Sequence, residues 1–158
     1  MTTHDYRLDF QLRLPYSASN KLLMGQLALW QGPKLIKHYP ATSGCISYQF
    51  KGSQRFKGRG PLPASAQLGE DQYRVITTPL DGKNIRGIRG LFFAITPSTV
   101  KIGGTVRGDF CLHNDSDGPG SAGCVVTELD LDWAELSALL VNLNKIGILK
   151  IPLKVSYL

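Results

Sequence analysis

The sequence has few of the residues from which metal sites and disulfide frameworks are built. It holds three cysteines and three histidines in 158 residues, and no Cys-x-x-Cys pair. An odd number of cysteines cannot all pair within one chain, so at least one thiol stays free. Zinc sites are recognised by closely spaced Cys and His ligands. With His4, His38 and His113 far apart in the chain, the spacing predicts no zinc site.

Long apolar runs are also missing. No stretch approaches the roughly 18 continuous apolar residues that a membrane-spanning helix requires. Residues 1–8 lack the basic-then-apolar layout of a secretory signal. We therefore expect no membrane contact. If the protein acts in the periplasm or cell wall, we expect another export route.

Low-complexity tracts and internal repeats are absent too. Apolar residues make up 42% of the chain and charged residues 19%, which is typical of a globular protein. A length of 158 residues suits one domain with its own core, so we predict a single domain over residues 1–158. The 17 glycines and 9 prolines predict many tight turns, and hence many strands.

Alternation of apolar and polar residues predicts a mainly β fold. The pattern runs without a break through residues 6–14, and residues 25–31 and 34–39 resemble a hairpin joined at Gly32-Pro33. Further strands are predicted at residues 72–77, 91–96, 108–113 and 151–157.

One helix is predicted from Asp132. Glu135 lies three residues later, which is the spacing of a capping box. Gly147 is placed to end the helix. Its apolar face consists of Trp133, Leu136, Leu139, Leu140 and Leu143. We expect this face to pack on the sheet behind Cys124.

Positive charge is concentrated in the first part of the chain. Residues 1–108 carry 15 basic and 5 acidic residues, a balance of about +10, whereas residues 109–158 carry 3 and 7, about −4. A basic surface favours an anionic partner, either nucleic acid or an acidic cell-wall polymer, and a solvated face chosen for solubility is the competing explanation. The basic section at residues 51–59 has no aromatic stacking platform, so nucleic acid is the weaker candidate.

The stretch at residues 110–126 carries the chemistry. An apolar strand ends at His113, a loop of turn-forming residues follows, and a second apolar strand begins at Cys124. A histidine can activate a cysteine as base and as positive charge, and the loop must bring the two strand ends to face each other. The Ser121-Ala-Gly123 segment before the thiol allows close approach, and the backbone N–H of Gly123 can face a developing oxyanion.

Structural explanations compete for the neighbouring residues. A free cysteine is most often a small buried hydrophobe, so we assign Cys45 and Cys111 to packing. Asp115 and Asp117 could orient the imidazole, but acidic residues in turns usually bind their own backbone. We assign Asp117 to the turn and leave Asp115 open.

These residues resemble the L,D-transpeptidase catalytic domain, and most closely its compact effector and lysin branch. The resemblance rests on His113, a variable loop, Ser121-Ala-Gly-Cys124, an apolar strand and a helix. Residues 25–44 resemble the family's opening hairpin, with Ser43-Gly44 as its Ser/Thr-Gly element. Residues 60–63 resemble its Gly-Pro-hydrophobic-Pro turn. The similarity covers the chain from about residue 25, so the strand at 6–14 would be a family-specific addition.

The resemblance implies a β-sandwich or open barrel, with one helix after the catalytic cysteine. Cys124 would attack a murein stem peptide and form a thioester, with His113 transferring the proton. Gly123, Ser121 and Asp115 would support the site, and Ser43 and Gly44 would contact substrate. No metal or organic cofactor is implied.

Three positions differ from the usual transpeptidase pattern, namely Asn114, Ala122 and Val126. Transpeptidase, carboxypeptidase and endopeptidase activities therefore all remain open. The alternative from another class is a basic module that binds cell wall or nucleic acid without catalysis.

Overall fold

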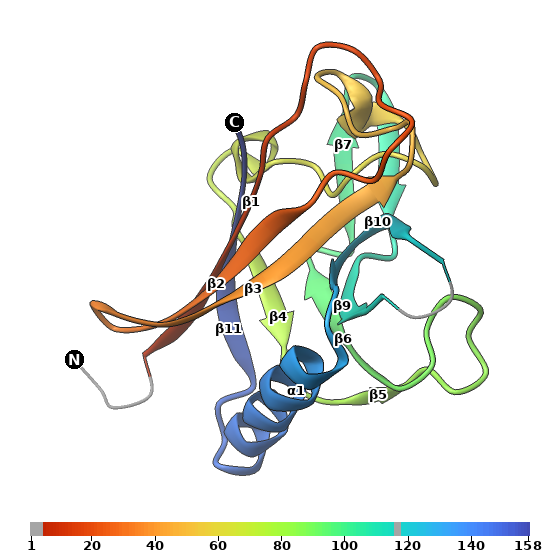
Figure 1. Ribbon diagram of the computed structural model, residues 1–158. Helices are drawn as coiled ribbons and strands as arrows, with labels where there is room; N and C mark the ends of the chain where they lie inside the picture. Colours follow the sequence, from red (N-terminus) through yellow and green to blue (C-terminus); the bar gives the residue numbers. More distant parts are fainter. Residues whose placement is uncertain (1–4, 116–117) are drawn as a thin grey trace.

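Eight strands form a closed barrel in the computed structural model, which describes residues 5–115 and 118–158 (Figure 1). The order around the barrel is β4-β11-β1-β2-β3-β10-β9-β6, and pairing between β4 and β6 closes the ring. These strands are β1 (Tyr6–Leu12), β2 (Gly25–Gln31), β3 (Lys34–Cys45), β4 (Tyr73–Ile76), β6 (Leu91–Thr96), β9 (Cys111–Asn114), β10 (Gly120–Thr127) and β11 (Lys150–Tyr157). The predicted mainly β fold is confirmed.

Smaller elements decorate the barrel. Strand β5 (Leu80–Asp81) pairs antiparallel with β6. Strands β7 (Thr99–Ile102) and β8 (Thr105–Gly108) form a separate hairpin. Two 3-10 turns cover Ser53–Arg55 and Ser65–Leu68. Figure 1 shows the β7–β8 hairpin at one end of the barrel and the helix at the other.

Strand β1 is integral to the barrel. It pairs antiparallel with β2 and parallel with β11. Its alternating pattern places Leu8, Phe10 and Leu12 in the core, each at most 2% exposed. Whatever its origin, this strand cannot be removed without opening the barrel between β2 and β11.

The helix α1 spans Asp130–Lys145 and begins two residues earlier than predicted. Leu129 occupies the N-cap without a side-chain hydrogen bond, so the predicted capping box is wrong. Asp132 and Glu135 instead bind Lys37 of β3, at 3.1 and 2.6 Å. Two carboxylates that lie beside a lysine from another strand form ion pairs there, and they are no longer available to the helix terminus.

The helix packs through the apolar face that the sequence predicts. Leu136, Leu140 and Leu143 are buried in the barrel core, and the Trp133 ring meets the edge of Phe93 at 5.8 Å between centroids. Gly147, at φ +89°, donates its N–H to the carbonyl of Asn144 and ends the last turn. Among the described residues, no helix is long and apolar enough to span a membrane.

Replacing Leu140 by Ala should lower the free energy of unfolding by about 3 kcal/mol, because a fully buried leucine leaves a cavity. Leu131 on the same helix is 85% exposed, and Leu131→Ala should cost about 0.5 kcal/mol or less. Urea denaturation of both variants measures the difference. Equal losses would mean that α1 is not packed on the barrel as described.

Candidate active site

Strand β9 presents two functional side chains on one face. Cys111 and His113 are two residues apart, and side chains at that spacing in a strand point to the same side. Both are buried, each 6% exposed, and Leu112 between them faces the core. The alternation Cys-Leu-His is therefore the sequence pattern that indicates that Cys111 and His113 share a face of the strand.

Strand β10 brings Cys124 to these residues by parallel pairing. Val125 and Val126 pair with Leu112 and His113, so the predicted arrangement of two facing strand ends is wrong. The chain does loop back after β9, but it then runs alongside β9 in the same direction. This register places Cys124 next to Cys111 and diagonal to His113.

Cys111 is a direct neighbour of the candidate nucleophile. Its backbone N–H donates to the Sγ of Cys124 at 3.2 Å, and the two Sγ atoms lie 2.7 Å apart. The prediction that Cys111 only packs is wrong, because burial and contact with a second thiol occur together here. In the contact between the two thiols either sulfur could be the donor, and Cys111 is the donor when Cys124 is the thiolate.

A wide bulge precedes the thiol. Strand β10 begins at Gly120 and not at Cys124, and its pairing with β3 passes from Gly120 opposite Cys45 to Val125 opposite Ser43. Two steps along β3, from Cys45 to Ser43, therefore correspond to five steps along β10, from Gly120 to Val125. The Ser121 hydroxyl donates to the carbonyl of Cys124 across this bulge. Ser121 thus shapes the backbone around the thiol, and its role as a supporting residue in catalysis stays a prediction.

The guanidinium of Arg107 holds the backbone of the bulge at Ala122. Arg107 is 1% exposed and donates to the Ala122 carbonyl at 3.2 Å. A Cβ on Gly123 would lie 2.6 Å from Arg107 Nη2, and Gly123 has φ +127°, so only glycine fits. In a trans peptide the C=O and N–H point in opposite directions. Arg107 therefore turns the N–H of Gly123 away from itself.

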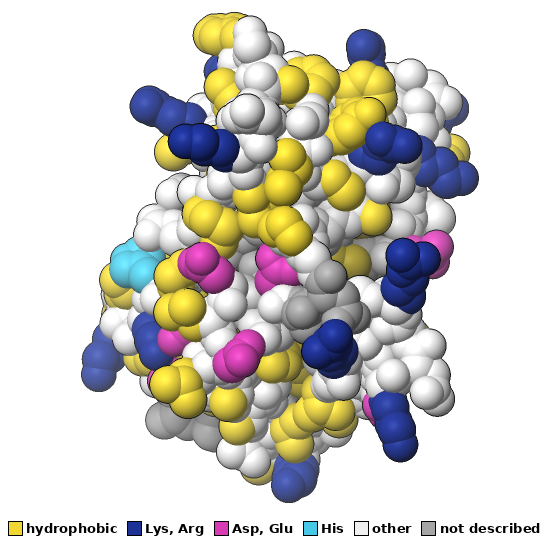
Figure 2. All heavy atoms as spheres, turned by 45° about the vertical axis from the view of Figure 1, so that its right-hand side comes forward, with side chains coloured by type: hydrophobic (Ala, Val, Ile, Leu, Met, Phe, Trp, Pro, Cys, Tyr) yellow, Lys and Arg dark blue, Asp and Glu magenta, His cyan; other side chains and the backbone are white. Residues whose placement is uncertain are grey.

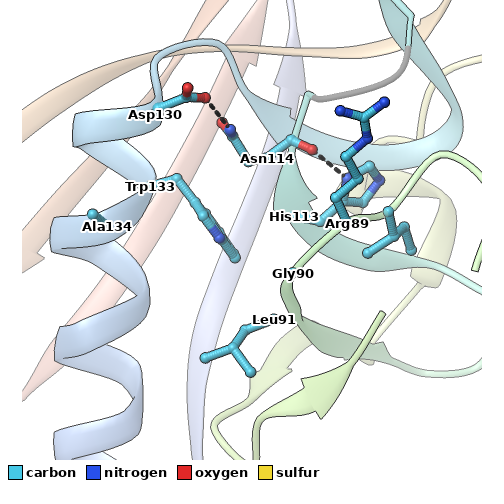
Figure 3. Close-up of a pocket in the computed structure, with 9 residues that line it drawn as sticks. Arg89, Gly90, Leu91, His113, Asn114, Asp130, Trp133 and Ala134 are labelled. Atoms are coloured by element: carbon cyan, nitrogen blue, oxygen red, sulfur yellow. Dashed lines mark hydrogen bonds between the residues drawn. The ribbon is translucent and has the colours of Figure 1, made fainter. Parts of the chain in front are cut away.

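The imidazole of His113 is oriented by Asn114. The Nδ1 of His113 lies 2.7 Å from the Asn114 carbonyl oxygen. A carbonyl only accepts, so Nδ1 carries the proton and Nε2 is left to face Cys124. Figure 3 shows the continuation of this contact, in which the Asn114 amide donates to Asp130 at the start of α1, at 2.7 Å. Thr127 donates its hydroxyl to the Asn114 side-chain oxygen at 3.0 Å.

Asp115 has a structural contact instead of a contact with the imidazole. Its carboxylate accepts the backbone N–H of Gly120 at 3.1 Å, which closes the loop between β9 and β10. Burial raises the pKa of Asp115. Asp117, which we assigned to the turn, lies outside the described residues.

The electrostatics of the cluster favour a thiolate on Cys124. The hydrogen bond from the Cys111 thiol, followed by that from His113 and its positive charge, lowers the pKa of Cys124 to about 5 despite burial. Burial alone lowers the pKa of His113, but the hydrogen bond and charge of Cys124 outweigh it and raise that pKa. The pKa of Cys111 is raised by its hydrogen bond to Cys124 and by burial. These shifts favour a thiolate on Cys124 beside an imidazolium on His113, with Cys111 as a thiol.

Two cavities reach the thiol. One, of about 400 Å³, is lined by both Cys124 and His113 and bounded by Arg86 and Pro119. Another, of about 250 Å³, lies between Cys124 and the basic section at Lys57. A ligand can therefore approach Cys124 through either cavity.

A third cavity, of about 280 Å³, lies beyond His113 and contains Arg89, so each of the three cavities has a basic residue in its lining. On the face that Figure 2 shows, most Lys and Arg side chains stand apart from one another, with Asp and Glu between some of them. Of the basic residues in the three cavities, Arg86 and Lys57 share their cavities with Cys124.

Ser43 and Gly44 lie in the barrel wall. The Ser43 side chain is fully buried and accepts the N–H of Leu62 at 2.9 Å, which contradicts its predicted contact with substrate. Gly44 is buried at φ +93°, and a Cβ there would lie 3.0 Å from the backbone N of Pro61. Both residues hold the turn at residues 60–63 against β3. Their contribution to the site is therefore indirect.

Cys45 provides an internal comparison for Cys124. It lines the same 400 Å³ cavity, but its Sγ donates to the Ser121 carbonyl at 3.4 Å. Burial raises the pKa of Cys45. Two thiols that face one cavity thus differ in ionisation because their donors differ.

The three site residues also form the one group among the described residues whose side chains could hold a metal ion. One ligand atom each from Cys111, His113 and Cys124 lies within 4.8 Å of the others. Spacing in the sequence did not reveal this set, because its third member comes from a neighbouring strand. Two sulfurs and an imidazole suit a soft divalent ion such as zinc.

Alkylation of Cys124 by iodoacetamide should show a midpoint near pH 5, because the rate follows the thiolate fraction and that fraction rises with pH through the pKa. In His113→Ala the midpoint should move upward, toward that of an ordinary thiol. Cys45, whose pKa is raised, should stay unlabelled at pH 6 in both proteins. Peptide mapping separates the sites. A wild-type midpoint above pH 8 would contradict the ion pair.

The chain was compared with known protein families and with curated proteins. No protein-family model matches the chain, and the search of curated proteins returned no match.

Proposed function

We propose that the protein is a cysteine-dependent peptidoglycan-modifying enzyme that acts on murein stem peptides through a thioester. The observation that carries this proposal is geometric: the Cys124 sulfur lies in one cluster with His113, Asn114 orients the imidazole, and the adjacent bulge requires glycine at position 123. These are the parts that acyl transfer needs, namely a nucleophile, a proton carrier and a donor for the oxyanion.

The first half-reaction begins from the ion pair. The Sγ of Cys124 attacks a peptide carbonyl, and a C–S bond forms while the carbonyl oxygen becomes an oxyanion. The N–H groups of Gly123 and Cys124 are the proposed donors to that oxygen. The imidazolium of His113 gives its proton to the amine, the C–N bond breaks, and a thioester is left on Cys124.

The second half-reaction restores the starting state. The now neutral His113 takes a proton from water or from an incoming amine, which attacks the thioester carbonyl. The C–S bond breaks and the thiolate returns beside the imidazolium. Water as acceptor gives a carboxypeptidase or endopeptidase, and an amine gives a transpeptidase.

Basic residues in the cavity linings support an anionic peptide as substrate. Stem peptides carry free carboxylates, and Lys57, Arg86 and Arg89 lie in the linings of the cavities around the thiol. A cation beside a carboxylate in a cavity is attracted more strongly than in open water. The two cavities that Cys124 lines give room for the acyl chain and for the leaving or incoming amine.

The direct test is incubation of purified muropeptides with wild type, Cys124→Ala and Cys45→Ala, followed by mass spectrometry. Wild type and Cys45→Ala should change the muropeptides, and Cys124→Ala should leave them intact. Loss of a terminal D-residue, cleavage of a cross-link or gain of a D-amino acid would each name the reaction. Retention on sacculi with no Cys124-dependent change would instead support a binding module.

Gly123→Ala should reduce kcat on the same muropeptides by about 100-fold, because a Cβ pushes against Arg107 and turns the proposed oxyanion donor away. Gly118 lines the cavity that Cys124 and His113 share, and a Cβ there meets open space, so Gly118→Ala should keep wild-type kcat. The alkylation midpoint of Cys124 should stay near pH 5 in both variants. Wild-type turnover in Gly123→Ala would exclude this donor.

A further inference from the structure

We propose that Cys111 and Cys124 form a reversible redox pair, in which peroxide oxidation of the nucleophile is captured as a Cys111–Cys124 disulfide. The inference goes beyond the proposed function, because it concerns the two thiols alone and needs no peptide substrate. It assigns a chemical role to Cys111 beyond its hydrogen bond.

The fold brings the two sulfurs together without any rearrangement of the strands. Cys111 and Cys124 lie on adjacent strands in parallel pairing, and their Sγ atoms are 2.7 Å apart. A disulfide has an S–S length of about 2.05 Å, so the sulfurs need to approach by less than 1 Å. Cys45 makes a poorer partner, because its Sγ is turned to the Ser121 carbonyl and it does not belong to the cluster within 4.8 Å.

Access and protection differ between the two thiols. Cys124 lines two cavities and is only half-buried, so a small oxidant can reach it. Cys111 is 6% exposed and lines a separate cavity of about 370 Å³. Cys124 is the more exposed of the two and the one whose pKa is lowered, so oxidant reacts first at Cys124, and Cys111, with its Sγ 2.7 Å away, is positioned to react with the product.

The first step oxidises Cys124 with hydrogen peroxide. The thiolate sulfur attacks one peroxide oxygen, an S–O bond forms and the O–O bond breaks. The leaving hydroxide takes the proton of the His113 imidazolium and departs as water. Cys124 is left as a sulfenic acid and His113 as a neutral imidazole.

The second step uses Cys111 as the resolving thiol. Neutral His113, which belongs to the same cluster within 4.8 Å, takes the thiol proton of Cys111. The Cys111 sulfur attacks the Cys124 sulfur, the S–S bond forms and the S–O bond breaks. The leaving hydroxide receives the proton from His113, so one peroxide becomes two waters and two thiols become one disulfide. A dithiol reductant reverses the change.

The test treats fully reduced wild type with one equivalent of hydrogen peroxide in the presence of EDTA, which keeps metal ions off the cluster. Remaining thiols are alkylated and the protein is cut with trypsin. Residues 108–145 contain Cys111 and Cys124 without an internal Lys or Arg, whereas Cys45 falls in residues 38–51. The disulfide should appear as peptide 108–145 lighter by two hydrogens, with Cys45 still alkylated, and dithiothreitol should restore both thiols.

Two variants provide the controls. Cys45→Ser should form the disulfide as wild type does. With a second equivalent of hydrogen peroxide, Cys111→Ser should instead gain two oxygens at Cys124 and pass through the sulfenic acid to the sulfinic acid, which dithiothreitol does not reverse. Wild type that oxidises Cys124 to sulfinic acid while Cys111 stays alkylatable, or that joins Cys45 to Cys124, would overturn the proposal. Because the readout is mass and not muropeptide turnover, this result is independent of the test of the proposed function.

Discussion

The backbone around the site depends on the buried side chain of Arg107. The guanidinium of Arg107 donates to the carbonyls of Gln54 and Gly60 at 2.8 and 2.9 Å, to that of Pro61, and to that of Ala122 at 3.2 Å. These carbonyls come from the basic section, from the turn that follows it and from the bulge before Cys124. Buried carbonyls need donors, and a charged donor satisfies them more strongly than a neutral one. Removal of Arg107 would therefore release three segments at once.

Much of the fold could be predicted from the sequence, because strand signals are local. The strands at residues 25–31 and 91–96 have the predicted bounds, and alternation identified β1 and β11. One local prediction, the capping box, was wrong because a distant residue competes. The carboxylates of Asp132 and Glu135 bind Lys37 instead of capping their own helix. Such competition cannot be read from spacing along one segment.

The site was predictable only in part for the same reason. His113 and Cys124 stand in a stretch whose composition is unusual, so both could be singled out. Cys111, Asn114 and Arg107 required the register of β9 with β10 and the path of the turn at residues 60–63. Parallel pairing is the decisive step, since a hairpin-like arrangement would put other residues beside the thiol.

The position of Cys111 links the two proposals through one contact. A donor close enough to stabilise the Cys124 thiolate must also be close enough to react with it when the donor is itself a thiol. A serine or backbone N–H at that place would lower the pKa of Cys124 without redox chemistry. The contact at 2.7 Å thus gives Cys124 a stronger thiolate character and, with it, a partner for disulfide formation. The hydrogen bond that favours the nucleophile and the susceptibility to oxidation have the same structural origin.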